Sequence, residues 1–163
     1  MAAEKILLGY GTVSVGGTPI GLTRGGSAFV VEREYRPIEA DGDKGPVKDR
    51  IFIDSEVAKL TVNALELFTA ANMTKYYPGT KLTTGTLTSN LKIVAGDYND
   101  VVWTGKTLDG KAVTVTVKDA INMGNLEWNF EDKNEVVPVL EFTATYAEAT
   151  RDSVAPWQVV FAA

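Results

Sequence analysis

Short runs in which apolar and polar residues alternate recur along this 163-residue chain, and turn-forming residues separate them. In one run Val113, Val115 and Val117 alternate with threonine and lysine, and Asp109-Gly110 stands just before it. Successive side chains of a β-strand point to opposite faces, so this pattern predicts a strand with one buried face, and Asp-Gly predicts a hairpin turn. We therefore expect an all-β fold, either a β-sandwich or a small barrel.

The same alternation predicts strands elsewhere in the chain. The segments concerned are residues 12–15, 28–35, 49–53, 101–104, 126–131, 139–146 and 157–161. Gly16-Gly17 predicts a turn with positive φ at both residues, and residues 23–27 predict a second glycine-rich bend. Apolar residues change from even to odd positions between Ala64 and Leu65. This change predicts a bulge or a bend, because a shift of one residue reverses the face.

One short helix is predicted over residues 69–77. Thr69 can cap its start, and Phe68 can pack against Met73 across the cap as a hydrophobic staple. Pro78 follows the last helical residue, and glycine follows Pro78. A helix of about two turns has little stability of its own, so we expect it to depend on packing against the rest of the protein.

Composition narrows the classes of function. The chain has no cysteine and no histidine, which removes disulfides, thiolate metal sites and the usual general base. Its net charge of −5 is unfavourable for tight nucleic-acid binding, which depends on neutralising phosphates. The length fits a single domain, residues 1–163. Residues 1–9 are interpreted as an N-terminal arm whose apolar run is too short for a signal peptide or a membrane span, which predicts a cytoplasm-like compartment.

The most charged and turn-rich stretch runs from Glu32 to Asp54. From Glu32 to Arg50 it holds six acidic and five basic residues. If the predicted strands on either side pair, this stretch is a long flap. Its end is then an extended charged loop, residues 36–50, with glycine and proline concentrated at the tip, residues 40–46. Such a segment has no core of its own, so it is either a solvated loop or a surface for a partner.

Two groups of carboxylates could carry chemistry, and each has a simpler interpretation. Asp41, Asp43 and Asp49 resemble the start of a calcium loop but lack the ligand spacing of an EF-hand. Glu127 and Glu141 could face each other across strands as a glycosidase pair, although solvated or interface carboxylates are the simpler interpretation. The sequence therefore predicts no catalytic residue, no metal site and no cofactor.

The three tryptophans, Trp103, Trp128 and Trp157, could stack on sugars or bases. Trp128 and Trp157 are in phase with apolar neighbours, which favours core packing for both. An exposed Trp103 would support a carbohydrate-binding β-sandwich module, which stays as the alternative function. An apolar arm, a charged flap and strands with threonine-rich and glutamate-rich outer faces are otherwise typical of a structural subunit that assembles.

The order of the segments resembles a known protein family. Residues 16–26 read GGTPIGLTRGG, residues 38–48 read IEADGDKGPVK, residues 59–66 read KLTVNALE, and residues 140–146 read LEFTATY. In this order, with a short helix that ends in Tyr-Pro-Gly, they resemble the tail tube protein, or major tail protein, of bacteriophages with long non-contractile tails. The resemblance extends over nearly the whole chain and rests on structural motifs.

The resemblance implies a β-sandwich with a flanking helix, assembled as stacked hexameric rings that form the hollow tail tube through which DNA is ejected. Four inner strands of each subunit would join into a barrel around the lumen. The implied partners are copies of the same chain, the tape measure, tail terminator and baseplate proteins, and passing DNA that is not specifically bound, with no membrane. The implied location is the host cytoplasm during assembly and then the virion tail. The tube of a phage-derived bacteriocin shares these features.

The resemblance also implies that the flap and the arm bridge adjacent subunits. The predicted interface residues are Ile6, Leu7, Leu8, Arg36, Glu39, Asp41, Asp43, Lys44, Lys48 and Arg50. Nearly balanced charges suit head-to-tail contacts, in which one surface meets a different surface of the next copy. An acidic protein suits a conduit, because a wall that bound DNA tightly would hold it. We expect the flap tip, residues 38–47, to be disordered in a free chain and ordered in a tube.

Overall fold

The computed structural model describes residues 4–163. Within them the chain is all-β with one short α-helix, which confirms the predicted fold class. The strands are β1 (Leu7–Val15), β2 (Thr18–Pro19), β3 (Thr23–Pro37), β4 (Ile51–Ala64), β5 (Thr80–Thr83), β6 (Thr86–Ser89), β7 (Asn99–Thr107), β8 (Ala112–Asn122), β9 (Val139–Thr143) and β10 (Trp157–Phe161). The helical segments are α1 (Met73–Tyr76) and the 3-10 turns η1 (Ala70–Asn72), η2 (Ala95–Asp97) and η3 (Glu148–Thr150).

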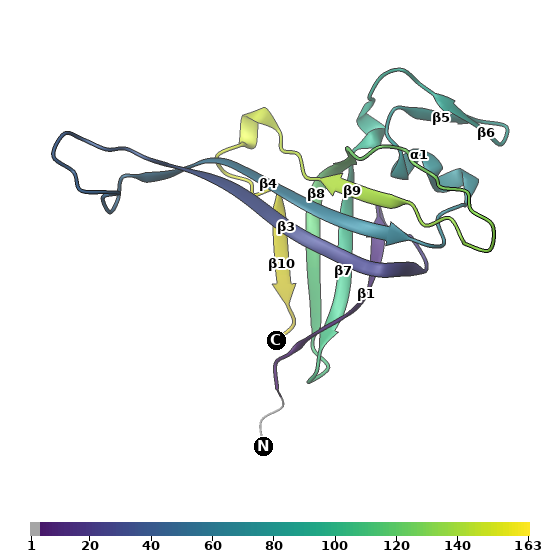
Figure 1. Ribbon diagram of the computed structural model, residues 1–163, viewed down its shortest axis with the longest axis horizontal. Coiled ribbons are helices and arrows are strands. Elements are labelled where there is room, and N and C mark those ends of the chain that lie inside the picture. The colour runs from purple at the N-terminus through teal and green to yellow at the C-terminus, as the bar shows by residue number, and fades with distance from the viewer. Residues whose placement is uncertain (1–3) are drawn as a thin grey trace.

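Two layers of strands cross each other in the body of the molecule (Figure 1). In the first layer β1, β7, β8 and β10 form a four-stranded sheet in which every neighbouring pair is antiparallel. In the second layer β9, β4 and β3 lie side by side, and the end of β8 joins the layers by pairing with β9. β2 extends one edge of β1, while β5 and β6 make a separate hairpin. The arrangement is sandwich-like, with the core between the layers.

Alternate residues of the four-stranded sheet point into the core. The register places Val15, Val101 and Val117 in one row across β1, β7 and β8, and all three are fully buried. Leu60 and Phe142, which are neighbours on β4 and β9, are buried from the other layer. Burial of a side chain of this size contributes about 1.5–3 kcal/mol. These rows therefore hold the two layers together.

The predicted strand at residues 126–131 is wrong. Residues 124–138 contain no strand. Trp128 is half-buried, and its indole Nε1 donates a hydrogen bond to the Tyr77 hydroxyl at 2.9 Å. Phe130, which alternation placed on the same face, is 79% exposed. Alternation alone does not form a strand here, because no neighbouring strand offers backbone hydrogen bonds to this segment.

The helix predicted over residues 69–77 is shorter in the structure, where η1 is followed by a single turn, α1. Thr69 precedes η1 but makes no side-chain capping hydrogen bond, so the predicted cap is wrong. The Phe68 ring packs edge-on against the Trp128 indole, with ring centroids 5.1 Å apart. Met73 is buried, which agrees with a helix that depends on packing.

The predicted turns and bends are present, one of them inside a strand. Gly16 and Gly17 have φ values of 55° and 82°, as predicted for the first hairpin. Residues 23–27 lie inside β3, and the predicted bend is present as an irregularity of that strand: Gly25 and Gly26 have φ values of 91° and 80°, and the register with β4 shifts there. The chain bends at Leu65 and Glu66 after β4 ends, as the change of phase predicts.

Two predicted segments have different ends in the structure. β9 ends at Thr143 rather than at Tyr146, and Tyr146 is exposed rather than inward-facing. The N-terminal arm is already a strand from Leu7, which pairs with Thr107. Residues 1–3 of the predicted arm lie outside the described residues.

Candidate assembly surfaces

The four-stranded sheet has two open edges. β10 pairs with β8 on one side, and no strand in residues 4–163 pairs with its other side. β1 pairs with β7, and on its outer side β2 pairs with Ser14 and Val15, while the amide of Ile20 donates to the carbonyl of Val13 at 2.9 Å. An unpaired edge presents backbone donors and acceptors that can pair with another chain. Both edges are therefore candidate surfaces for assembly.

The backbone groups that point to the open edge of β10 can be assigned to residues. The amide of Ala162 donates to the carbonyl of Ala112 across the β8–β10 ladder at 2.9 Å. Hydrogen-bonded and non-hydrogen-bonded pairs alternate along an antiparallel ladder. The backbone amides and carbonyls of the even-numbered residues of β10 therefore point toward β8. The amides and carbonyls of Trp157, Val159 and Phe161 then point to the open edge.

Strand direction allows the open edges of two copies to continue one sheet. β1, β7, β8 and β10 alternate in direction, so β10 runs opposite to β1. Beside β1 of a second copy, β10 would add another antiparallel pair. β10 has five residues, and β1 has nine, of which residues 18–20 cover Val13, Ser14 and Val15, leaving six for a partner. The two edges therefore match in direction and are long enough to pair.

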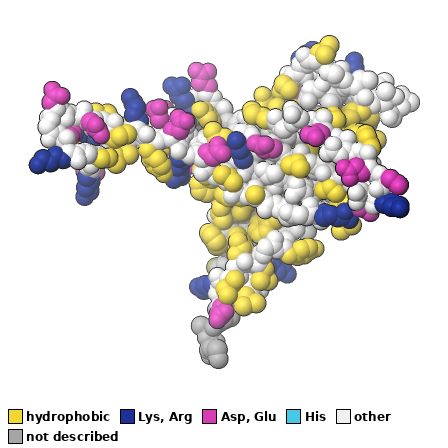
Figure 2. All heavy atoms as spheres, in the orientation of Figure 1, with side chains coloured by type: hydrophobic (Ala, Val, Ile, Leu, Met, Phe, Trp, Pro, Cys, Tyr) yellow, Lys and Arg dark blue, Asp and Glu magenta, His cyan; other side chains and the backbone are white. Residues whose placement is uncertain are grey.

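Apolar side chains are exposed near both edges. The predicted interface residues Ile6, Leu7 and Leu8 are all exposed at the start of β1. Val160 and Phe161 are exposed on β10. Figure 2 shows hydrophobic side chains gathered over the lower part of the body, where these segments lie. Covering exposed apolar surface is favourable, so these side chains suit a contact with another copy.

The flap is a two-stranded arm that leaves the body (Figure 1). Its ladder pairs Tyr35 with Ile53 and Pro37 with Ile51. The amide of Ile38 donates a hydrogen bond to the carbonyl of Arg50 on the opposite strand. Directly opposed residues lie on the same face of a two-stranded ladder. All four ladder residues are exposed. They form an apolar strip on one face of the hairpin. Within the body, the same face of the β3–β4 ladder covers the core.

Part of the flap's charge is already paired within the flap. Asp43 Oδ2 lies 2.7 Å from Arg50 Nη2 and accepts the amide of Ala40 at 2.7 Å. Arg36 Nε lies 3.4 Å from Asp54 Oδ1. Three of the predicted interface residues therefore hold the flap itself together.

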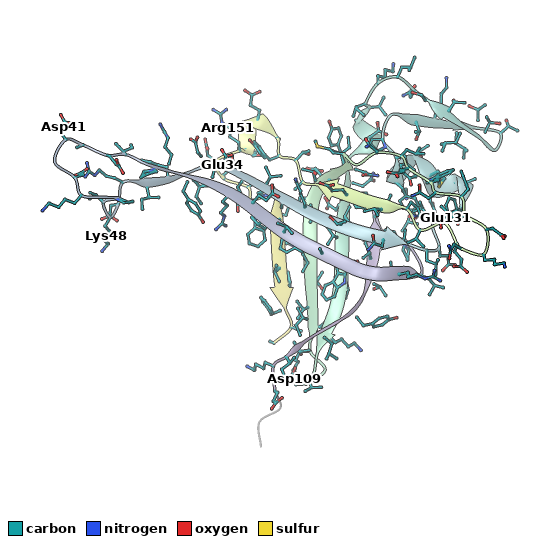
Figure 3. The ribbon with its side chains drawn as sticks, viewed as in Figure 1. Glu34, Asp41, Lys48, Asp109, Glu131 and Arg151 are labelled. Carbon is teal, nitrogen blue, oxygen red and sulfur yellow. The ribbon has the colours of Figure 1, made fainter. Side chains whose placement is uncertain are left out.

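The other four predicted flap residues, Glu39, Asp41, Lys44 and Lys48, lie near the tip and make no ion pair within the described part of the chain. Asp41 and Lys48 are labelled at the far end of the flap in Figure 3. The two carboxylates and two amines are exposed, so all four charges are accessible to a partner. The structure places them far from the apolar arm, so the predicted interface divides into two separate surfaces (Figure 1).

Glu56 connects the root of the flap with β10. Its Oε1 accepts hydrogen bonds from Trp157 Nε1 at 3.0 Å and from Arg33 Nη2 and Nε at 2.8 and 2.9 Å. The indole hydrogen bond, followed by the Arg33 guanidinium, lowers the pKa of Glu56, and the same ion pair raises the pKa of Arg33. The Trp157 ring also packs 5.7 Å from the Phe29 ring. One carboxylate therefore links the two candidate surfaces.

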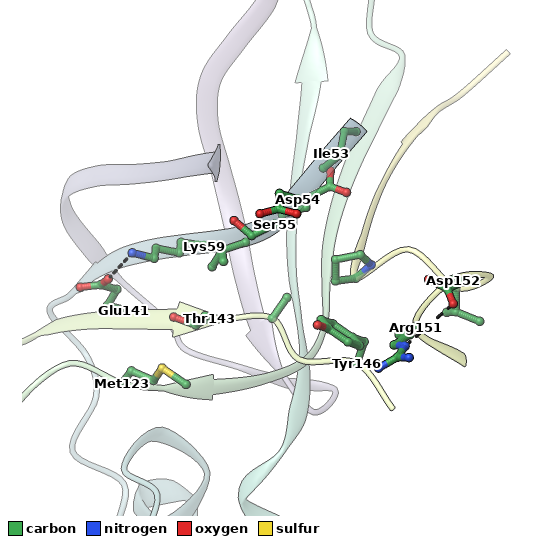
Figure 4. A pocket seen from close by; sticks show the side chains of 15 residues that line it. Ile53, Asp54, Ser55, Lys59, Met123, Glu141, Thr143, Tyr146, Arg151 and Asp152 are labelled. Carbon is green, nitrogen blue, oxygen red and sulfur yellow. Dashed lines mark ion pairs between the residues drawn. The ribbon is translucent and has the colours of Figure 1, made fainter. Parts of the chain in front are cut away.

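A trough of about 850 Å³ lies along β4 and β9 beside residues 144–156 (Figure 4). Lys59 Nζ lies 3.6 Å from Glu141 Oε1 in this trough, and Arg151 pairs with Asp152 on its rim. The trough is lined by both signs of charge and by apolar side chains. Its shape is open, and its cations are paired with carboxylates.

The carboxylates considered for catalysis or metal binding do not gather. Glu127 is exposed in the segment without strands, so the predicted arrangement of Glu127 and Glu141 across strands is wrong. Asp43 is held by an arginine, while Asp41 and Asp49 are exposed. No group of three or more metal-ligating side chains is found within residues 4–163.

Trp103 faces the space between the layers. A Cβ added at Gly11 or Gly105 would come within 2.5 Å or 2.3 Å of its indole ring. The ring borders an apolar hollow of about 280 Å³ together with Phe29 and Leu60. Trp103 is half-buried there, which differs from the exposed ring that stacking on a sugar requires.

Two features of these surfaces were missed by sequence reasoning. The open edge of β10 has no sequence signal, because a strand's position in a sheet depends on which strands pair. The apolar strip of the flap did have a signal, since Ile51 and Ile53 stand at alternate positions, with Phe52 between them and Arg50 and Asp54 on either side. Alternation predicts that the two isoleucines share one face, but it does not show that this part of the hairpin extends beyond the body.

A scan against protein-family models gave no match, and a search of curated proteins found no significant similarity. Among residues 4–163, no helix is both long enough and apolar enough to span a membrane.

Proposed function

We propose that this chain is a tail tube subunit, which assembles into stacked hexameric rings and forms the hollow tube for ejection of phage DNA. The observation that carries the proposal is the four-stranded sheet with two open edges of matching direction. Lateral pairing of β10 with β1 of the next copy closes the sheets of all copies into one barrel and removes every open edge of the four-stranded sheet. The four strands correspond in number to the inner strands that the family resemblance implies.

The flap supplies a second kind of contact in this proposal. Its exposed apolar strip and the charged residues Glu39, Asp41, Lys44 and Lys48 near its tip favour docking on a copy in the adjacent ring. A contact that joins two different surfaces of identical subunits can repeat without closing. Ring closure through the sheet edges and stacking through the flap together produce a tube.

Electron microscopy of the purified protein in negative stain tests the proposal, with rings or tubes as the expected result. Val159→Pro removes an amide that points to the open edge of β10, and it leaves the hydrogen bonds to β8 in place. We expect this variant to fold as a monomer that forms no rings, because proline is tolerated on the free side of an edge strand.

Val160→Pro is the matched control, because the Val160 amide faces β8. This variant is expected to melt at a lower temperature than Val159→Pro, since it breaks a bond of the internal ladder. Normal tubes from Val159→Pro would overturn the edge contact. A wild-type protein that stays monomeric at high concentration would overturn the proposed function.

A further inference from the structure

The outward face of the four-stranded sheet has a distinctive composition. Val101 and Val117 point into the core, so their neighbours along each strand point outward. The register aligns the outward side chains in two rows: Ser14, Val102, Thr116 and Gln158 in the first, and Thr12, Thr104, Thr114 and Val160 in the second. These rows, called the hydroxyl band below, cross the sheet from one open edge to the other.

The hydroxyl band carries no charge, although the chain has 16 basic and 21 acidic residues. Charges on this face stand at its two ends. At one end, Lys106 lies opposite Ala112 in the β7–β8 ladder, next to the turn between these strands. At the opposite end, Lys118 lies near Asp100, whose Oδ1 accepts the amide of Asp119 at 2.9 Å. The acidic residues responsible for the net charge are therefore placed away from the middle of this face.

We infer that the hydroxyl band is a neutral wall past which duplex DNA moves without being held, an inference that rests on the proposed function. Non-specific affinity for DNA comes from cations that displace the counterions of phosphates. Hydroxyl groups can donate hydrogen bonds to phosphate oxygens, but they displace no counterions. A band without carboxylates does not repel phosphates either. Because the band reaches both open edges, ring closure makes it continuous around the channel.

The first test measures retention of a short fluorescent DNA duplex by assembled tubes, collected by sedimentation over a range of salt concentrations. Wild-type tubes are expected to retain no more duplex than a tube-free control at any salt concentration. The double variant Thr104→Lys/Thr114→Lys places two cations side by side within the band. Its tubes are expected to retain about tenfold more duplex at low salt and to release it as salt rises.

The matched control adds the same charge elsewhere. Thr86→Lys/Thr88→Lys changes two exposed threonines of β6, which lies outside the four-stranded sheet. Its tubes are expected to behave like the wild type. If the double variant in the band does not assemble, Thr104→Lys co-assembled with wild-type chains repeats the test at lower charge.

The outcomes separate the inference from the proposed function. Salt-dependent retention by wild-type tubes would overturn the neutral wall and leave the tube intact. Equal retention by the two lysine variants would place the band outside the channel and overturn the inference as well. Failure of the wild type to form tubes would instead overturn the proposed function, and the neutral wall with it.

Discussion

Two segments extend from opposite ends of the body, and they are held in different ways. Figure 3 labels Asp41 and Lys48 on the flap and Glu131 in the segment of residues 124–138. The flap has its own ladder of backbone hydrogen bonds and its own ion pairs. The other segment has no ladder and is attached through Trp128 to the core. A paired hairpin can extend without a core, whereas an unpaired segment depends on side chains that reach one.

The largest effect on stability is expected where the segment of residues 124–138 joins the core. Trp128→Ala removes the hydrogen bond to Tyr77 and the edge-on contact with Phe68. We expect a loss of roughly 2–3 kcal/mol in the free energy of unfolding, below the range for a fully buried tryptophan. Urea denaturation measures it. Phe130→Ala, at a largely exposed ring, is the control and should change stability by less than about 0.5 kcal/mol.

If Trp128→Ala were as stable as the wild type, residues 124–138 would not depend on this anchor, and the contrast with the flap would fail.

A smaller effect is expected at the root of the flap. Glu56→Gln replaces the carboxylate that accepts hydrogen bonds from Arg33 and Trp157. We expect a loss of about 1 kcal/mol at neutral pH, because the group is only partly buried. Thermal denaturation at several pH values measures the difference. Glu127→Gln, an exposed carboxylate of the other segment, should have no effect.

The pH dependence of this difference has a definite sign. The pKa of Glu56 is lowered in the folded protein, so its stabilising contribution is fully present above the pKa of the unfolded chain. The contribution is lost as the pH falls through the lower, folded pKa. The difference between wild type and Glu56→Gln should therefore shrink in acid. A difference that stays constant down to the acid transition would contradict an ionised Glu56 as its source.

The smallest effect on stability, with the largest effect on assembly, is expected from deleting residues 40–46 at the flap tip. The tip contributes no residue to the core, so the change in unfolding free energy should stay within about 1 kcal/mol. Negative-stain images should show rings without stacked tubes. Hydrogen exchange of wild-type residues 38–47 should be fast in the free chain and slow in the tube.

Normal tubes from the deletion variant, or equal and strong protection of residues 38–47 in both states, would show that the flap is a solvated loop. The hairpin would then still differ from residues 124–138 in how it is held, but would have no role in stacking.

Local patterns predicted much of the fold because they report on one strand and its turn. The alternation of Val113, Val115 and Val117 predicted β8, and Gly16-Gly17 predicted the first turn. The same rule failed at residues 126–131, because a strand needs a partner whose position is decided elsewhere in the chain. The candidate surfaces were predicted in part: the sequence indicated a charged flap and an apolar arm, but not the open edge of β10.

The sequence by itself determined the all-β class, the turns with positive φ and the charged character of the flap, because these depend on neighbouring residues. Only the tertiary structure decided which strands became edges, which face of the four-stranded sheet points outward, and which flap charges are already paired. The physical reason is that pairing and burial depend on residues far apart in the chain. Asp43 forms an ion pair with Arg50, which is near it in the sequence. Glu56 accepts a hydrogen bond from Trp157, which is 101 positions away in the sequence.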